Sequence, residues 1–436
     1  MQLGPIRPRV AGSALTNGHF MLLYAAMLVA AAGNTALQSV MPGIGRAIGI
    51  SDFWVTVSYT SSAVLWVLLA PFWARQSDLH GRKALTLLGV GGFIVSMFLC
   101  GLVLVAGLEG ALAGGATFIL FAICRAIYGS LGCATPSATQ AYLASRTRRS
   151  ARVTALSALS SSFGLGTIVG PALAPLFVLP LVGLAGPLLA FAVIGLVVFV
   201  SILKWLPDDK KPRHGPRAGH GAAMSYPSLA SSPTGASVIA ATAPKMALLK
   251  WHDPRIRHWI IAGVVSGHAQ AATLSCIGFF MIDKLGLPAR GSAQSIAIVM
   301  MTGAAATLAA QWGLIPKLGL SPRTLILWGA VVAAAGALVT MVAGDLYGIV
   351  LGFGLTSLGF GFTRPGFTGG ASLAVPLGQQ GGVAGVVTAA NGIAYVAAPG
   401  LGIALSAIDP HWPFAASAAL LLGLVVWGWR SLRTAD

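Results

Sequence analysis

Charge is the scarcest feature of this sequence. Only 8% of the residues are charged, whereas an ordinary soluble domain carries about 25%. Hydrophobic residues make up 56%, and the mean hydropathy is +0.82. So little charge excludes a soluble globular domain, and the composition predicts a polytopic membrane protein. Glycine is abundant, as expected where membrane helices pack closely.

Acidic residues are especially few, with ten in the whole chain. None of them falls in the middle of a predicted membrane span. Exporters that exchange protons for cationic drugs usually need a buried carboxylate, and this sequence has no obvious one. Asp52 and Asp283, near the outer ends of predicted helices, are the nearest substitutes.

Sequence signals of catalysis and of cofactor binding are also missing. The absence of a G-x-x-x-x-G-K-[ST] loop argues against an ATP-driven pump. A membrane enzyme is disfavoured because there is no His-rich metal motif and no nucleophile with its base. The four cysteines lie in apolar stretches without Cys-x-x-Cys spacing, so neither a disulfide nor a metal site is predicted. We expect no cofactor.

The apolar stretches predict twelve membrane helices, because a span needs about 20 apolar residues. The expected fold class is an all-α membrane protein with two pseudo-symmetric bundles of six helices. The predicted spans are 20–43, 53–73, 84–106, 114–143, 152–178, 183–206, 258–282, 292–313, 323–343, 346–373, 381–406 and 411–430.

The distribution of basic residues indicates how the spans are oriented. The net charge is +17, and with the N-terminus inside, the cytoplasmic segments hold 22 of the 27 lysines and arginines. Three more fall in outer loops (Arg46, Lys284 and Arg290) and two inside spans (Arg125 and Arg364). This asymmetry follows the positive-inside rule and predicts a multi-pass protein of the inner (plasma) membrane with both termini cytoplasmic. A nucleic-acid partner is disfavoured because no soluble basic face is predicted; we expect a monomer in the lipid bilayer.

A polar segment divides the chain into two parts. Residues 207–250 are rich in Pro, Gly, Ser and Lys and predict a flexible linker, and the stretch ALLKWHDPRIRHW after it predicts an interfacial helix. The predicted domains are therefore an N-terminal bundle (1–206), a cytoplasmic linker with its interfacial helix (207–257) and a C-terminal bundle (258–436).

Weak internal matches support a duplicated unit. GRKALTLLG (81–89) aligns with SPRTLILWG (321–329), and Pro171 parallels Pro399. Duplicated halves are the way in which many transporters build alternating access.

The turn between the second and third spans places Asp78, Gly81, Arg82 and Lys83 between two apolar runs. Gly81 permits a tight turn, and Asp78 can pair with Arg82 or with a neighbouring helix N-terminus. A pair that forms in one conformation only would act as a conformational switch, because it biases the equilibrium between two states. The alternative is a short basic loop that only fixes the topology.

These four residues resemble the loop motif of the major facilitator superfamily, G-x-x-x-D-x-x-G-R-K, with Ala74 in place of its first glycine. In span 4, Arg125 and Gly129 are similar to the family's R-x-x-x-G motif, and Gly129 is a predicted helix-packing residue. The resemblance implies the major facilitator fold and a part for Arg125 in proton transfer or anion binding. A structural arginine bonded to backbone carbonyls is the alternative.

Span 5 resembles a motif of the twelve-span drug:proton antiporter branch, G-x-x-x-G-P-x-x-G-G. Gly166, Gly170 and Pro171 match it, whereas Ala174 and Pro175 replace its last two glycines. Small residues at these positions predict close helix packing, and the proline predicts a bend. This resemblance implies export rather than import.

Both charges inside the predicted spans are positive. Arg125 and Arg364, one in each half, would suit an anionic or zwitterionic substrate, because arginine binds carboxylates through two parallel hydrogen bonds. The alternative for Arg364 is snorkelling to the cytoplasmic interface, since it lies only about 14 Å from its helix end at 1.5 Å per residue.

Neutral polar residues add candidates for the substrate cavity. Spans 1, 4, 7 and 10 line the cavity of the family that the chain resembles, which makes Asn34, Gln38 and Gln270 candidates, and a stripe in span 11 adds Asn391 and Tyr395. Each of them could instead bond to a neighbouring helix. His268 is the candidate proton site of span 7, because histidine titrates near neutral pH.

The sequence thus predicts a secondary active transporter that exports a small organic molecule by alternating access, with the proton as the coupling ion. The alternative is a transporter of an organic anion or a siderophore-like metabolite that uses Arg125 and Arg364 and does not require proton antiport. A receptor with a transporter fold, which binds a ligand without moving it, is a further alternative.

Overall fold

The computed structural model of the chain describes residues 16–146, 152–208, 252–375 and 380–432. Most of the predicted linker and of its interfacial helix lies outside these ranges; residues 252–256 contain turns that lead into the next helix. The side chain of Asp78 also lies outside the described part of the chain, although its backbone belongs to a helix.

Long helices make up the described chain, because a lipid-embedded backbone must satisfy its hydrogen bonds internally. Eleven described helices are long and apolar enough to cross a membrane, and the predicted fifth span contains the shorter apolar helix Ser161–Phe177. Each of the twelve predicted spans coincides with helical structure, which confirms the all-α membrane fold.

The first half contains α1 (Asn17–Ile48), α2 (Asp52–His80), α3 (Arg82–Leu108), α4 (Gly114–Ile127), the π-helical η1 (Tyr128–Gly132), α5 (Ala134–Arg146), α6 (Arg152–Leu173), the 3-10 helix η2 (Ala174–Phe177) and α7 (Gly186–Trp205). The second half contains α9 (Arg257–Leu285), η3 (Ala289–Gly291), α10 (Ala293–Leu308), the π-helical η4 (Ala309–Leu314), α11 (Ile315–Leu318), α12 (Pro322–Val342), α13 (Leu346–Leu373), α14 (Gln380–Ser406) and α15 (Trp412–Ser431).

Local sequence explains where several helices end. Gly49 and Gly286, at φ 77° and 59°, close α1 and α9 in the left-handed conformation that glycine adopts without strain. Gly81 alone separates α2 from α3 at φ 96°, which accounts for the tight turn predicted there. The carboxylate of Asp345 caps α13 by accepting a hydrogen bond from Gly348 N at 2.7 Å.

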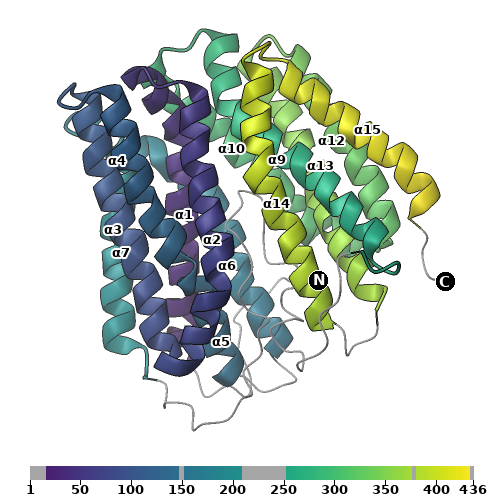
Figure 1. The fold of residues 1–436 in the computed structure, drawn as a ribbon, viewed down its shortest axis with the longest axis horizontal. Helices are drawn as coiled ribbons and strands as arrows, with labels where there is room; N and C mark the ends of the chain where they lie inside the picture. Colours follow the sequence, from purple (N-terminus) through teal and green to yellow (C-terminus); the bar gives the residue numbers. More distant parts are fainter. Residues whose placement is uncertain (1–15, 147–151, 209–251, 376–379, 433–436) are drawn as a thin grey trace, which may run out of the picture.

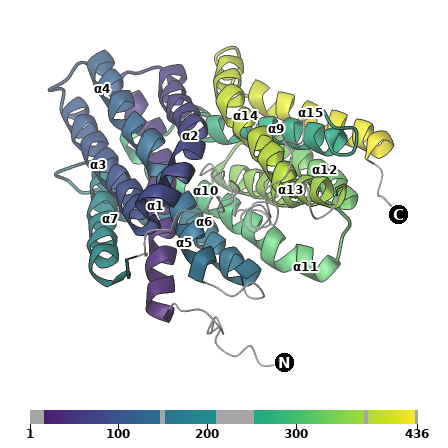
Figure 2. The same cartoon turned by 60° about the horizontal axis from the view of Figure 1, so that its bottom comes forward.

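The two halves stand side by side (Figure 1), with the first half in purple to teal and the second in green to yellow. Contacts between them join α2 to α14, α6 to α10, and α1 to both α9 and α10. The view in Figure 2 likewise places α6 and α10 at the junction. The face that carries the α1–α2 and α9–α10 connections is called the outer face below, in keeping with the predicted topology.

Glycines set the closest approach inside the first half. A Cβ on Gly166 would lie 2.6 Å from Leu28 O, and one on Gly170 would overlap Ala32 O and Thr35 Oγ1. Thr35 Oγ1 donates to Ala31 O on its own helix at 3.0 Å and lies 3.4 Å from Gly166 O on α6. The backbones of α6 and α1 therefore meet where the sequence predicts small residues.

Candidate functional site

Among the described side chains of the first half, Arg125 is the most deeply buried charge. It lies near the end of α4 and is 1% exposed. Its Nη2 donates to Asn34 Oδ1 on α1. The guanidinium carbon lies 4.6 Å from the ring centre of Tyr128 and 5.8 Å from that of Tyr59. Two aromatic faces and one amide therefore surround the charge, and cation–π attraction contributes to holding it.

The hydrogen-bonding capacity of this site is only partly used. Within the described part of the chain, Nε and Nη1 of Arg125 and Nδ2 of Asn34 are buried and have no hydrogen-bond partner. No carboxylate among the described residues forms an ion pair with Arg125, although a buried guanidinium normally has such a partner. The site thus offers three unpaired N–H groups of Arg125 and one net positive charge.

A π-helical segment follows Arg125 directly. Residues Tyr128–Gly132 form this turn, and π-turns of this kind occur often at functional sites. Tyr128 packs against the Trp66 and Phe93 rings, at centroid distances of 5.4 and 5.8 Å. A Cβ on Gly129 would lie 2.6 Å from Ser62 O, so this predicted packing glycine brings the segment against α2.

Arg364 is the corresponding charge in the second half. It lies within α13, directly before Pro365, and is 7% exposed. Tyr395 on α14 is close enough to interact with it electrostatically. The side chain is therefore enclosed by protein, and the two buried arginines lie one in each half.

A narrow cavity lies between the halves and extends toward the outer face. Its volume is about 80 Å³, which is too small for a drug-sized molecule in this conformation. The predicted residues Gln38 and Tyr395 both line it, one from each half. Tyr59 lines it as well and also contacts the Arg125 guanidinium, so one side chain joins the cavity to the buried charge.

The other predicted cavity residues lie apart from this site. Gln270 lines a separate pocket of about 30 Å³ with Thr273 and Ser357. Asn391 donates to Val387 O at 3.0 Å on its own helix. The Nδ1 of His268 lies 2.7 Å from Val264 O, also on its own helix, and this half-buried histidine lines none of the cavities described above. The structure brings together Asn34 with Arg125, and Gln38 with Tyr395.

The residues predicted to form a conformational switch contact their own half. Lys83 Nζ donates to Leu203 O near the end of α7 at 3.1 Å and pairs with Asp208 at 2.9 Å. Arg82, next to Gly81, begins α3, and its carbonyl accepts from Thr86 Oγ1 at 2.8 Å. The described contacts of this turn therefore join α3 to α7, while the pairing of Asp78 is not described.

Sequence reasoning missed three groups that the structure places at the junction. Tyr59 and Thr60 line the cavity from α2, and Ser275 lines it from α9. The polar run YTSS (59–62) in the middle of an apolar span was the available signal. The ion pair between Arg46 and Asp283 had no such signal, because 237 residues separate its members.

Comparisons with known proteins agree with this architecture. The sequence profile of the Major Facilitator Superfamily matches residues 23–394. No curated protein sequence is detectably similar to this chain.

Three similar solved structures cover nearly the whole chain. They are the human organic anion transporter MFSD10 (16% identity, TM-score 0.61, 94% of this chain and 99% of that one), a point mutant of the nucleoside transporter NupG (11%, 0.68, 96% and 100%) and a bacterial homologue of the iron transporter ferroportin in its inward-facing state (17%, 0.67, 95% and 99%). At such low identity these likenesses establish the fold and not the substrate.

Proposed function

Because the chain belongs to the major facilitator superfamily, we propose that it is a secondary active transporter whose substrate is a small organic molecule with an anionic group. The observation that carries this proposal is the buried, partly unpaired guanidinium of Arg125. An unpaired buried donor destabilises a protein by about 1–3 kcal/mol, so a site that leaves several unpaired favours a ligand that accepts from them.

A carboxylate fits this site by charge and by geometry. Nη1 and Nη2 of one guanidinium can donate to the two oxygens of a carboxylate in parallel, and Nη2 carries a second hydrogen besides the one that it donates to Asn34. Such a ligand would also neutralise a charge for which the described residues supply only Asn34 and aromatic faces. The mostly apolar lining of the neighbouring cavity suits an apolar body on the same molecule.

Export in exchange for protons is the direction and coupling that we propose. It is supported by the resemblance of Arg125 and Gly129 in span 4 to the family motif and of the α6 glycines to the motif of the drug:proton antiporter branch. The described spans offer no carboxylate beside Arg125, so His268 is the proposed proton site, whereas Arg125, which stays protonated, is assigned to the anion.

The proposed location is the inner (plasma) membrane, with a monomer spanning the bilayer and both termini in the cytoplasm. The support is electrostatic, because Lys83, Arg146, Arg257 and Arg323 all lie at helix ends that twelve alternating spans put on one side.

Matched pairs of an organic acid and its methyl ester test the substrate class. Purified protein would be titrated with each pair, and binding would be followed by the rise in melting temperature. A ligand that binds only the folded state raises stability as RT ln(1 + [L]/Kd). We expect acids to raise the melting temperature and their esters to have little effect.

Two variants assign this discrimination to Arg125. Arg125→Gln should weaken acid binding by at least about tenfold, because a hydrogen bond to a charged group contributes about 1.5–3 kcal/mol. Arg125→Lys keeps the charge but loses the bidentate geometry, so an intermediate loss is expected. Equal binding of acid and ester would rule out the anionic substrate class, and unchanged acid binding in Arg125→Gln would rule out Arg125 as the site of the anion.

Coupling and direction need a separate assay in everted vesicles with an imposed pH gradient. Collapse of the gradient on addition of a binding acid, absent in Asp78→Asn, would support proton-coupled export. Transport of the acid without any proton movement would leave the substrate class standing and exclude proton exchange.

A further inference from the structure

We propose that Arg46, Asp52 and Asp283 form an outer ion cluster that holds the two halves together in the conformation closed at the outer face. This inference does not depend on the substrate class proposed above. It concerns which contacts break when the outer face opens.

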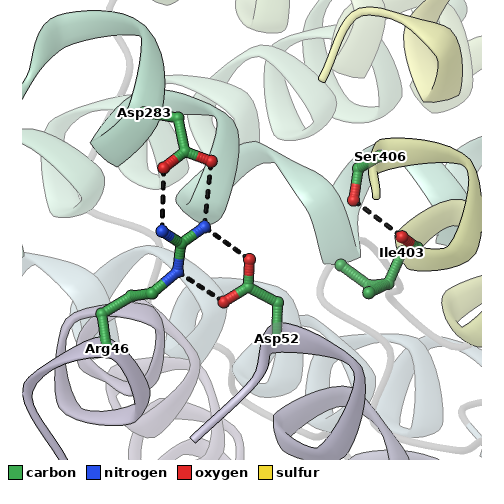
Figure 3. Close-up of polar contacts among 5 residues, drawn as sticks. All are labelled: Arg46, Asp52, Asp283, Ile403 and Ser406. Carbon is green, nitrogen blue, oxygen red and sulfur yellow. Dashed lines mark hydrogen bonds and ion pairs between the residues drawn. The ribbon is translucent and has the colours of Figure 1, made fainter. Parts of the chain in front are cut away.

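One guanidinium joins three helix ends in this cluster (Figure 3). Arg46 Nε and Nη2 donate to the two oxygens of Asp52 at 2.6 Å each, and Nη1 and Nη2 donate to those of Asp283 at 2.9 Å each. Arg46 and Asp52 belong to α1 and α2 of the first half, whereas Asp283 belongs to α9 of the second. The cluster is therefore a direct ionic connection between the halves.

The positions of Arg46 and Asp283 are equivalent in the two halves. Each residue stands three positions before the left-handed glycine that ends the first helix of its half, Gly49 in α1 and Gly286 in α9. Residues of a duplicated fold meet their own equivalents only near the pseudo-two-fold axis that relates the halves. The opposite charges at these positions thus lie close to that axis, where the halves separate when they rock apart.

An apolar layer lies directly beneath the cluster. A Cβ on Gly278 would lie 2.6 Å from Pro42 Cγ, so α9 and α1 cross in close contact there. Phe279, 4% exposed, lines both the cavity between the halves and a second cavity of about 490 Å³ that contains Arg46, Asp52 and Asp283. Phe279 therefore separates the inner cavity from the outer one, and the ions lie on its outer side.

We expect opening of the outer face to keep one ion pair of Arg46 and to break the other. The pair with Asp52 lies within one half, because only three residues separate α1 from α2. The pair with Asp283 spans the junction and must break when α1 and α9 separate. Opening therefore exposes the Asp283 carboxylate and removes one bidentate contact, which favours the closed conformation.

The native cysteine Cys276 offers a way to detect opening. It is 1% exposed and lines the outer cavity beside Phe279. Reaction of its thiol with a membrane-impermeant maleimide, located by peptide mass spectrometry, reports access from the outer face. Hydrogen–deuterium exchange at residues 43–48 and 279–285 gives a second readout that needs no thiol chemistry. Neither readout requires a substrate, so failure of this inference is distinguishable from failure of the proposed function.

Neutral variants should loosen the outer face. Arg46→Gln and Asp283→Asn should each raise the labelling rate of Cys276 and the exchange at both segments by about fivefold, the order expected for a partly exposed bidentate ion pair. The exchanged pair Arg46→Asp with Asp283→Arg keeps one guanidinium between two carboxylates, because Asp52 is retained, and should return both readouts to the wild-type rate.

The matched control is Asp345→Asn, which removes the charge of an outer carboxylate whose described partner, Gly348 N, is in the same half. It should change neither readout. Unchanged exchange in both single variants, failure of the exchanged pair to restore the wild-type rate, or an equal rise in Asp345→Asn would each overturn the proposal.

Discussion

The two halves of this protein share a hydrogen bond at their inner helix ends, but the surroundings of their buried arginines differ. At the inner face, Lys83 donates to Leu203 O, two residues before the end of α7. Arg323, which aligns with Lys83 in the internal repeat, donates to Trp429 O at 2.7 Å, two residues before the end of α15. Each half thus uses a cation at the start of its third membrane helix to bind a carbonyl near the end of its sixth.

The interiors diverge where the halves hold their buried arginines. Arg125 has three unpaired N–H groups of its own and is followed by a π-helical turn, whereas Arg364 is followed by Pro365 and lies near Tyr395. The difference teaches that a shared scaffold has kept its terminal contacts in both halves, while the surroundings of the two buried arginines have diverged. Four predictions would break or sharpen this comparison.

The largest effect is expected from the helix-packing residues. Gly170 precedes Pro171 in α6 as Ala398 precedes Pro399 in α14, but only the glycine faces a neighbouring backbone with no space for a Cβ. Gly170→Leu should abolish recovery of folded protein, because overpacking at a backbone contact cannot relax. Size-exclusion chromatography of solubilised protein checks this.

The reverse change in the second half is the control. Ala398→Gly should preserve a monodisperse protein, with a loss of about 1 kcal/mol from lower helix propensity. Equal recovery of folded protein from Gly170→Leu and Ala398→Gly would mean that the contact of α6 with α1 is no closer than the packing around Ala398 in α14.

The second largest effect concerns the buried arginines. Because Arg125 has unpaired donors next to the inter-half cavity, Arg125→Gln should weaken acid binding by at least about tenfold. Arg364→Gln should weaken it by less than about threefold, an expectation based on its depth of only about 14 Å from the inner end of α13. Melting-point titration with the acid and ester pairs measures both, and a larger loss in Arg364→Gln would move the proposed anion site to the second half.

A smaller effect is expected at the repeated inner contacts. Lys83→Ala and Arg323→Ala should each lower stability by about 0.5–1 kcal/mol, because each removes a cation from a helix C-terminus. Arg323 also lies 5.6 Å from the Trp429 ring centre, so its loss should be the larger of the two. Thermal unfolding monitors both variants.

Transport activity then distinguishes the two interpretations of Lys83. A variant that melts normally yet has lost transport would favour the conformational switch predicted from the loop motif. A variant that transports in proportion to its folded fraction would restrict Lys83 to a structural role in the first half.

The smallest effect is expected when the pH is lowered, at the outer loops that precede the last helix of each half, α7 and α15. Backbone and side-chain hydrogen bonds from His411 lower the pKa of Asp409 below its usual range. A depressed pKa means that this contact stabilises the native state above the unfolded value of about 3.9 and is lost as the pH falls through the folded value. The matching connection of the first half, residues 178–185, contains no titratable side chain.

Acid should therefore loosen the start of α15 and leave the start of α7 unchanged. Hydrogen–deuterium exchange between about pH 5 and pH 3 would detect the difference, with Asp409→Asn as the variant in which the pH dependence disappears. Similar acid sensitivity at both helix starts would contradict this assignment.

Much of the fold followed from local patterns. Apolar length located the twelve spans because each span must cross the same thickness of hydrocarbon. The glycines of α6 lie at close helix contacts and Gly81 has a positive φ, and both kinds of position exclude most other residues. The interruption of the fourth span by η1 was not predicted, because a π-turn changes helical rotation without changing composition.

Which candidate residues meet at the site could be predicted less well from the sequence. Asn34 and Arg125 were both candidates, but their contact depends on how α1 and α4 are rotated toward each other. Gln38 and Tyr395 line one cavity, whereas Gln270 lines another, although all three were chosen by the same criterion. Helical spacing identifies residues that share a face, but it does not show which helix that face meets.

The sequence by itself determined the membrane class, the number and position of the spans and the family resemblance, because these depend on transfer free energies and turn geometry that each segment carries locally. Only the tertiary structure decided that Arg125 has donors left unpaired, that Phe279 divides two cavities and that Arg46 reaches Asp283 across the junction. These contacts depend on the packing angles and rotations of helices that are far apart in the chain, and no local pattern of residues specifies them.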